Sequence, residues 1–467
     1  MPETLVGTDL AYYLIAFDAN GKERANNGEL ISQTVLNIIS ESRKSGQPIT
    51  DVFLMSHGWQ GDIPAAKDQY DRWIAAMAKN EADIQKMQQL RPGFRPLLIG
   101  LHWPSKPWGD ENLDAVTTDK TIVSFEVTDN SQEELINQYS QSIADTEAAR
   151  DALRTIFSAA TEYDVAPDTL PSEVREAYKV LIKEASSSSE GEDADGWSES
   201  ESLNLDPDTV YEASLAQEEG DVSFGIETSV KSAADAFLNV PRLLSFWKMK
   251  DRARKIGRTS GFNLLNRLQQ VTDNSVRFHL MGHSFGCIFV SAIVAGTDDK
   301  KLLRPVNSLA LIQGAFSLWG FCANVPYRNN CHGYFRSIIT GNKVAGPIIT
   351  TQSIYDKAVK NAYPMAGTLG ILGGQDINFD VDTSIYPGVG GVGCYGIQGD
   401  GLNISTDITY MQPLDKPYNF EPGKIYNLNS NDYIYVPPSL LDQFVGAHNA
   451  IDKPEVAHAV WSAAFGS

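Results

Sequence analysis

The sequence predicts an α/β fold with a mostly parallel central sheet and helices on both of its faces. Short apolar runs with β-forming residues alternate with longer segments in which apolar residues recur at helical spacing. Most of these runs are continuously apolar, as expected for parallel strands buried on both faces. The chain has 467 residues, of which 42% are hydrophobic and 21% charged. That is enough for one large globular domain with insertions, or for two or three domains.

Residues 1–103 are expected to form the N-terminal part of this α/β domain. Three short apolar runs predict strands, at Leu10–Phe17, Asp51–Ser56 and Pro96–His102. Two stretches of helical spacing lie between the strands, at Leu30–Arg43 and, as a single long amphipathic helix, at about Ala65–Leu90. The first of these helices is ended by Gly46-Gln47-Pro48.

Residues 104–255 interrupt the strand–helix pattern and are expected to form a helical, partly disordered insertion. Helices are predicted at Gln132–Tyr163, Ser172–Ala185 and, as a basic amphipathic helix, at about Ser229–Lys255. Between them, residues 186–221 are rich in Ser, Glu and Asp. Such a segment cannot bury enough apolar surface to order itself.

Residues 256–467 resume the alternation and are expected to form the C-terminal part of the α/β domain. Helices are predicted at Asn263–Gln270, Phe285–Ala295 and Pro454–Phe465. Strands are predicted at Val276–Met281, Ser308–Gln313, Pro347–Gln352 and Lys424–Leu428. The segment Gly367–Gly401 is rich in glycine and is expected to form irregular loops.

The net charge of −21 is concentrated in one segment. Residues 184–227 hold 14 acidic residues and no Lys or Arg, which leaves a net charge of −7 on the rest of the chain. Nucleic acid is therefore not expected as a partner, because phosphate binding needs a basic surface. The acidic run is expected to be a solvated loop, and a docking site for a basic partner is the alternative.

The sequence lacks features typical of membrane, secreted and metal-binding proteins, and this guides the expected location and cofactors. No run approaches the ~20 apolar residues needed to span a bilayer, and the N-terminal residues carry no basic segment typical of a secretion signal. With four cysteines, of which Cys322 and Cys331 are the pair close enough to suggest a loop disulfide, a reducing, cytoplasmic location is expected. The cysteines lack metal-ligand spacing, so neither a metal nor a cofactor is predicted. Oligomeric state is left open.

The segment Gly282-His283-Ser284-Phe285-Gly286 lies between a predicted strand and a predicted helix. In this setting G-x-S-x-G predicts a nucleophilic serine on a sharp, strained turn, for which small residues are needed two positions away on each side. The turn exposes the serine hydroxyl, and the backbone N–H of Phe285 at the helix N-terminus is placed to face an anion. An ordinary tight turn is the alternative.

A serine hydroxyl needs a base, and a histidine held by a carboxylate is the usual one. Among the seven histidines, His448 is favoured because it lies between the last predicted strand and the last helix, where a parallel sheet brings loops over its carboxyl edge. His332 is a weaker candidate, and the absence of a base is a further alternative. His283 is expected to point away from the serine hydroxyl, and His458 to pack within the final helix.

These segments resemble the α/β-hydrolase superfamily, in which the nucleophile precedes the acid and the acid precedes the histidine along the chain. The resemblance implies that Ser284 is the nucleophile, Asp356, after the strand Pro347–Gln352, the acid, and His448 the base. Asp356 has a second interpretation as a helix cap. The weaker alternatives for the acid are Asp432, Asp376 and Asp380.

The resemblance also implies an oxyanion hole and a substrate pocket. The segment Ser56–Gly61 follows a predicted strand, and the N–H of Trp59 or Gly58 is expected to act together with that of Phe285, while His57 braces the loop. Residues near strand ends are candidates for substrate contact, with core packing as the alternative. The candidates are Trp59, His57, Trp103 and Phe316, together with Trp108 and Trp319.

A serine hydrolase that cleaves a carboxylic ester through an acyl-enzyme on Ser284 is therefore the expected function. A lipid ester is the specialised form of the substrate, and amide or thioester cleavage is not excluded. The insertion departs from the family, because it precedes the nucleophile, whereas caps in that family commonly follow the next strand. It still leaves the end of a strand, so it is expected on the catalytic edge. The alternatives are a hydrolase-shaped binding protein without activity and a scaffold that acts through its acidic loop.

Overall fold

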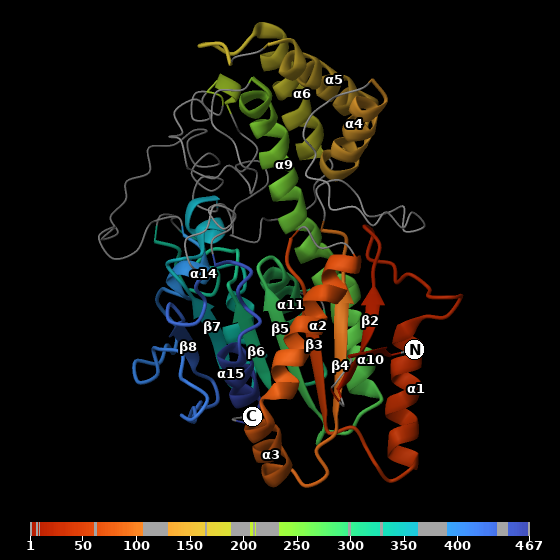
Figure 1. Cartoon of the computed structure of the whole chain (residues 1–467), viewed down its shortest axis with the longest axis vertical. Coiled ribbons are helices and arrows are strands. Elements are labelled where there is room, and N and C mark those ends of the chain that lie inside the picture. The colour runs from red at the N-terminus through yellow and green to blue at the C-terminus, as the bar shows by residue number, and fades with distance from the viewer. Residues whose placement is uncertain are drawn as a thin grey trace.

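The chain forms an eight-stranded sheet, which lies in the lower half of the molecule as drawn in Figure 1. The computed structural model describes residues 2–5, 8, 10–59, 63–105, 129–163, 166–187, 206–208, 211, 233–297, 300–326, 330–362, 390–436 and 447–465. The strand order is β1-β2-β4-β3-β5-β6-β7-β8. The short strand β1 (Glu3–Thr4) pairs antiparallel with β2, and every other pairing is parallel. The predicted mostly parallel α/β fold is confirmed at this level.

The strands lie close to the predicted ranges. They are β2 (Ala11–Ala16), β3 (Asp51–Ser56), β4 (Pro96–His102), β5 (Arg277–His283), β6 (Ser308–Ile312), β7 (Ile348–Gln352) and β8 (Ile425–Asn429). Side chains of each central strand alternate between two apolar layers. In β3, Val52 and Leu54 pack on one side of the sheet, while Phe53 and Met55 pack on the other. Because both sides are covered, all six residues of β3 are buried, which explains the unbroken apolar run.

Helices cover both faces of the sheet. One layer contains α1 (Ile31–Lys44), α10 (Phe262–Gln270) and α11 (Gly286–Ala295). The other contains α2 (Ile63–Lys79), α3 (Glu81–Leu90) and α15 (Pro454–Phe465). Short helices α12 (Arg336–Thr340) and α14 (Val392–Tyr395) and a π-helix, η2 (Ala358–Ala362), lie in the connections. The expectation of irregular loops over Gly367–Gly401 is therefore wrong for α14, and residues 363–389 lie outside the described residues.

The single helix predicted at Ala65–Leu90 is wrong, because the chain breaks between α2 and α3 at Asn80. The backbone of Asn80 is not helical, and its side-chain amide donates to Asp83 over 3.3 Å and to the carbonyl of Pro454 over 2.8 Å. Apolar spacing continues through this break, so periodicity alone did not reveal it. The contact with Pro454 at the start of α15 depends on tertiary structure.

The insertion extends beyond the end of the sheet at which the parallel strands terminate (Figure 1). Its described helices are α4 (Asp129–Ile143), α5 (Glu147–Glu162), α6 (Ser172–Ser187) and α9 (Ala233–Ile256). Helix α9 leads into a π-helix, η1 (Gly257–Gly261), which packs against α11. There, a Cβ on Gly257 would lie 2.6 Å from the carbonyl oxygen of Phe289. Most of the acidic segment 186–221 lies outside the described residues.

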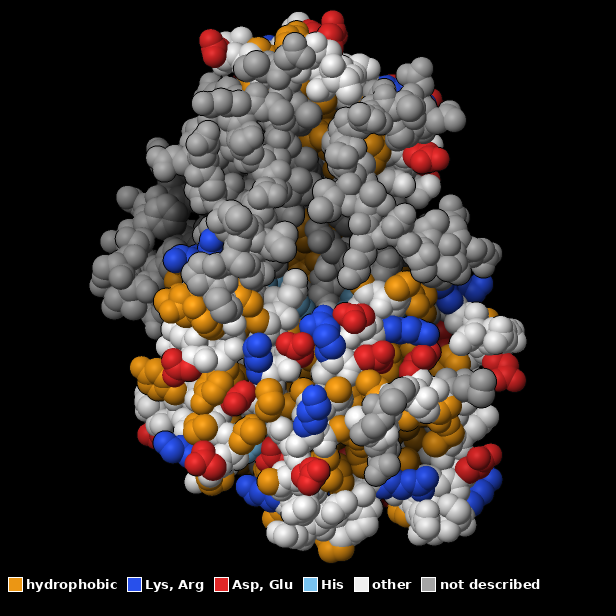
Figure 2. All heavy atoms as spheres, in the orientation of Figure 1, with side chains coloured by type: hydrophobic (Ala, Val, Ile, Leu, Met, Phe, Trp, Pro, Cys, Tyr) orange, Lys and Arg blue, Asp and Glu red, His pale blue; other side chains and the backbone are white. Residues whose placement is uncertain are grey.

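Charged groups of both signs are interspersed over the face of the sheet domain seen in Figure 2. No helix in the described part of the chain is long and apolar enough to cross a membrane. None of Cys287, Cys322, Cys331 and Cys394, all of which the structure describes, takes part in a disulfide, so the loop disulfide considered for Cys322 and Cys331 is not formed.

Candidate active site

Ser284 lies between β5 and α11 in a left-handed backbone conformation, with φ of 55°. This conformation is costly for a residue with a side chain. The turn leaves no room for larger neighbours. A Cβ on Gly282 would lie 2.4 Å from the carbonyl oxygen of Gly286, and a Cβ on Gly286 would lie 2.4 Å from the carbonyl oxygens of Ser56 and His57. The glycines two positions from the serine are therefore required by close backbone contacts.

The loop after β3 lies directly against this turn. A Cβ on Gly58 would come within 2.6 Å of the Ser284 Cβ, so glycine is what lets the loop approach the serine. The carbonyl oxygen of Gly58 accepts hydrogen bonds from His57 Nδ1 at 2.8 Å and from Ser105 Oγ at 3.0 Å. The Gly58 carbonyl and the Trp59 N–H belong to the same trans peptide, so they point in opposite directions. The N–H of Trp59 is therefore directed away from His57 Nδ1 and Ser105 Oγ.

The partners of His57 fix its tautomer. Nδ1 must carry the proton, since a carbonyl only accepts. Nε2 is then an acceptor, and it lies 3.0 Å from His102 Nδ1 and 3.3 Å from the backbone N–H of Trp103. Burial, followed by the proximity of His57, lowers the pKa of His102 well below its ordinary value, so His102 stays neutral. His57 is thus a buried brace for the loop, and its two ring nitrogens are occupied by protein groups.

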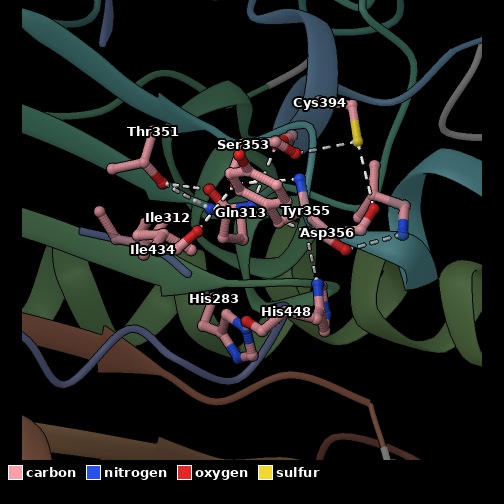
Figure 3. Close-up of polar contacts among 12 residues, drawn as sticks. His283, Ile312, Gln313, Thr351, Ser353, Tyr355, Asp356, Cys394, Ile434 and His448 are labelled. Carbon is pink, nitrogen blue, oxygen red and sulfur yellow. Dashed lines mark hydrogen bonds and ion pairs between the residues drawn. The ribbon is translucent and has the colours of Figure 1, made fainter. Parts of the chain in front are cut away.

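Asp356 and His448 form a buried pair. Asp356 lies in the turn after β7, His448 in the turn before α15, and His448 Nδ1 donates to Asp356 Oδ2 over 2.8 Å (Figure 3). The backbone N–H of Ala447 donates to the carbonyl of Tyr355 over 2.9 Å, which joins the two turns. Asp356 Oδ1 accepts from the N–H of Val359 at 2.9 Å. The sequence leaves two roles open for Asp356, helix cap and partner of the histidine. Its carboxylate fills both, with Oδ1 in the cap and Oδ2 on His448.

The serine turn and the histidine turn are in contact through His283. Its Nε2 donates to the backbone carbonyl of His448 over 3.0 Å, and the centroids of the two rings are 4.7 Å apart. The hydrogen bonds made by Ser284 and His448 within the described part of the chain do not include one between Ser284 Oγ and the imidazole. Such contacts are often long in the absence of substrate. The structure therefore pairs Asp356 with His448 and holds the His448 turn against His283, the residue before Ser284, without a hydrogen bond from Ser284 Oγ to the imidazole.

The alternative residues lie elsewhere. His332 Nδ1 lies 3.0 Å from the carbonyl oxygen of the adjacent Gly333, and no carboxylate among the described residues binds its ring. Asp432 is exposed to solvent. Asp376 and Asp380 lie outside the described residues. His458 hydrogen-bonds to Asp83 in the helical layer formed by α2, α3 and α15. This agrees with the expectation that it packs within the final helix.

The aromatic residues considered for substrate contact differ in position. Trp103 is fully buried between the His57 ring, at a centroid distance of 5.6 Å, and the Phe289 ring, at 5.9 Å. Phe316 is also fully buried, packed on two other phenylalanines. Core packing is thus favoured for both, and their contact with substrate stays a prediction. Trp59 is half-buried and packs on Phe285, 5.8 Å between ring centroids, beside the serine turn. Trp108 lies outside the described residues.

Two further residues at the site were not predicted. Gln313 and Ser105 follow β6 and β4, and their side chains bond to Asp356 and to the Gly58 carbonyl, respectively. A polar residue just after a buried parallel strand is the signal that could have identified both.

Comparison with models of known protein families, with curated proteins and with solved structures finds no match to this chain. What the site does therefore has to be argued from its own geometry.

Proposed function

We propose that this chain is a serine hydrolase of the α/β-hydrolase type that cleaves carboxylic esters through an acyl-enzyme on Ser284. The observation that carries the proposal is the buried hydrogen bond between Asp356 and His448. These residues are 92 positions apart in sequence, and the backbone carbonyl of His448 is bound by His283, which directly precedes a serine held at positive φ. A strained serine next to a carboxylate–imidazole pair is the arrangement that nucleophilic acyl transfer needs.

The order of the three residues supports the assignment to this type of enzyme. Ser284 follows β5, Asp356 follows β7, and His448 follows β8, in the chain order nucleophile, acid, histidine. The loop that holds Gly58 follows β3, the direct neighbour of β5 in the sheet. Parallel neighbours end at the same edge, so this loop meets the serine turn.

The proposed reaction assigns one task to each group. His448 Nε2 takes the proton of Ser284 while the serine oxygen attacks the ester carbonyl, and Asp356 holds the opposite ring nitrogen. The backbone N–H groups of Phe285 and Trp59 stabilise the oxyanion, since the first lies at a helix N-terminus and the second is turned away from His57. The imidazolium then protonates the leaving alcohol. Water, activated by the same histidine, releases the acid and restores the serine.

The substrate is expected to carry an apolar acyl or alcohol group. Ile354 and Tyr355, which directly precede the acid, are 55% and 42% exposed. Tyr435 is 40% exposed, and its ring packs against that of Tyr355 at 5.2 Å. Exposed apolar side chains beside a reactive centre favour a hydrophobic ligand, and a lipid ester is the specialised case.

A fluorophosphonate probe tests the proposal, because it phosphonylates an activated serine irreversibly. The chain offers a matched control at the opposite end of the strands. There, Asp51 Oδ1 lies 3.1 Å from His279 Nε2, and His279 Nδ1 lies 2.8 Å from Ser308 Oγ. This second serine–histidine–aspartate set is buried and lacks a strained turn. Both labelling and hydrolysis of short p-nitrophenyl esters should disappear in Ser284→Ala. Both should persist in Ser308→Ala.

A binding protein without activity is the second candidate. It is favoured by the missing hydrogen bond between Ser284 Oγ and His448, and by the low exposure of Ser284, 5%. A folded wild-type protein that neither reacts with the probe nor hydrolyses esters, lipids or thioesters would support this second function. Labelling that survives Ser284→Ala would contradict the assignment of the nucleophile.

A further inference from the structure

A buried glutamine shares the carboxylate of the acid–histidine pair. Gln313 follows β6 and is fully buried. Its Nε2 donates to Asp356 Oδ2 over 2.8 Å, the same oxygen that accepts from His448 Nδ1. Figure 3 shows Gln313 and His448 directed toward Asp356 from different elements.

The surroundings of Gln313 determine which end of its amide faces the carboxylate. Nε2 also lies 3.0 Å from the carbonyl oxygen of Gly393. A carbonyl and a carboxylate can only accept, so the atom facing both must be the NH2 group. The amide oxygen accepts from the Thr351 hydroxyl at 2.9 Å, and Thr351 Oγ1 in turn accepts from the backbone N–H of Gln313 at 2.9 Å. Both amide hydrogens and the amide oxygen are therefore satisfied in a single orientation.

The backbone at Gln313 is also unusual. Its φ is 47°, a left-handed conformation that side chains other than glycine rarely adopt. The chain that approaches it from α14 does so at a glycine, since a Cβ on Gly393 would lie 2.8 Å from the Gln313 carbonyl carbon and 3.2 Å from Asp356 Oδ2. The left-handed backbone of Gln313 and the close approach of Gly393 therefore both occur where Gln313 contacts Asp356.

From these observations we infer that Gln313 is a positioning residue for the reaction. It holds Asp356 Oδ2 in the direction of His448 Nδ1 and supplies the second hydrogen bond to that oxygen. The inference rests on the proposed function, and it adds a residue outside the serine, histidine and aspartate. Because the donated hydrogen bond draws electron density from the carboxylate oxygen, its loss should strengthen the bond from that oxygen to the imidazole.

Two variants separate positioning from general support of the fold. Gln313→Met keeps a side chain of similar length and removes the donor to Asp356. Thr351→Val keeps the shape of the threonine and removes the hydroxyl, which disturbs the same buried network without touching Asp356. Both should lower the melting temperature. Gln313→Met should in addition reduce kcat for ester hydrolysis by about 10- to 100-fold with little change in KM, as small displacements of catalytic groups do.

The pH profile is the readout that a purely structural role would not move. In Gln313→Met the acid limb of kcat should shift to higher pH, because the imidazole gains a proton more readily beside the altered carboxylate. In Thr351→Val the limb should stay where it is in the wild type. Equal losses of kcat in both variants, with unchanged acid limbs, would overturn the inference.

A measurement that does not require activity keeps the two proposals distinguishable. In protein with isotope-labelled histidine, the His448 Nδ1–H proton resonance and the titration of its ring can be followed by NMR. Both should change in Gln313→Met and stay close to wild type in Thr351→Val. If the wild type shows no hydrolase activity but this pattern appears, the positioning role holds and the proposed function fails. An unaltered His448 signal in Gln313→Met would refute the positioning role whatever the activity.

Discussion

His283 donates a hydrogen bond from Nε2 to the backbone carbonyl of His448 over 3.0 Å, and the two rings pack with centroids 4.7 Å apart. The residue before the proposed nucleophile thus holds the turn that carries the proposed base. Burial, followed by the proximity of His448, lowers the pKa of His283 well below its ordinary value. His283 therefore remains neutral at physiological pH, with its proton on Nε2, where the carbonyl needs it.

Replacing His283 by Phe tests this link. The substitution keeps an aromatic ring and removes the donor to the His448 carbonyl, so the histidine turn is released from the serine turn. We expect kcat for ester hydrolysis to fall by about 10- to 100-fold, with a smaller change in KM. Steady-state kinetics together with circular dichroism on the same samples separate this loss from unfolding. Wild-type kcat in a folded His283→Phe protein would show that the contact is dispensable.

The role of the acid is tested by Asp356→Asn. The amide has similar size but removes the charge that stabilises the imidazolium and orients its ring. Turnover of p-nitrophenyl esters should fall by about 10²- to 10⁴-fold. Asp432→Asn, a change at an exposed carboxylate, is the control and should stay near the wild-type rate. If the ranking is reversed, the acid has been assigned to the wrong residue.

Gly58→Ala tests the close approach of the loop after β3. The added Cβ would lie 2.6 Å from the Ser284 Cβ, so either the loop or the serine turn must move. We expect a loss of stability of about 1–3 kcal/mol, typical of overpacking, and a disproportionate loss of kcat, because the N–H of Trp59 moves with the loop. Urea unfolding and kinetics on the same preparation check this. A variant that loses stability but keeps kcat would argue against the loop as part of the oxyanion site.

Acidification should remove activity through His448, because the imidazole has to be neutral to take the serine proton. The rate is expected to fall as the pH is lowered, because the protonated imidazole can no longer accept the serine proton. A limiting slope of one in a plot of log kcat against pH would indicate a single proton. A rate that does not change between pH 5 and 9 would exclude a histidine base.

His458 gives a prediction about stability that is independent of catalysis. Burial lowers the pKa of His458, but hydrogen bonds to Asp83 and to the Lys416 carbonyl outweigh burial, so the pKa is raised in the folded state. A raised pKa stabilises the fold below the unfolded value of about 6.5, and this contribution disappears as the pH rises through the folded value. It links α15 to α3.

Asp83→Asn isolates that charge effect, since the amide can still accept from the imidazole. The variant should be less stable than the wild type at pH 6, by about 1 kcal/mol, and the difference should shrink at pH 9. Urea unfolding at the two pH values measures it. A difference that grows with pH would mean that His458 is not protonated in the folded protein.

The sequence by itself determined the layers of this protein and the position of the turn that holds Ser284. Continuous apolar runs, Val52–Met55 in β3 and Leu97–Ile99 in β4, mark these strands, because strands covered on both sides carry apolar residues at consecutive positions. The glycines around Ser284 follow equally from local geometry, because only glycine fits where two backbones nearly touch. Such features are local, and therefore one stretch of chain contains the whole signal.

Apart from the pairing of Asp356 with His448, which the resemblance implied, tertiary structure decided which side chains meet. Nothing near Gln313 in the sequence indicates that its amide faces Asp356, and nothing near His283 indicates that its ring rests on His448. At the break between α2 and α3, the side chain of Asn80 likewise bonds to a carbonyl at position 454. These contacts join segments that are distant in the chain, so they become visible only once the sheet has set their positions in space.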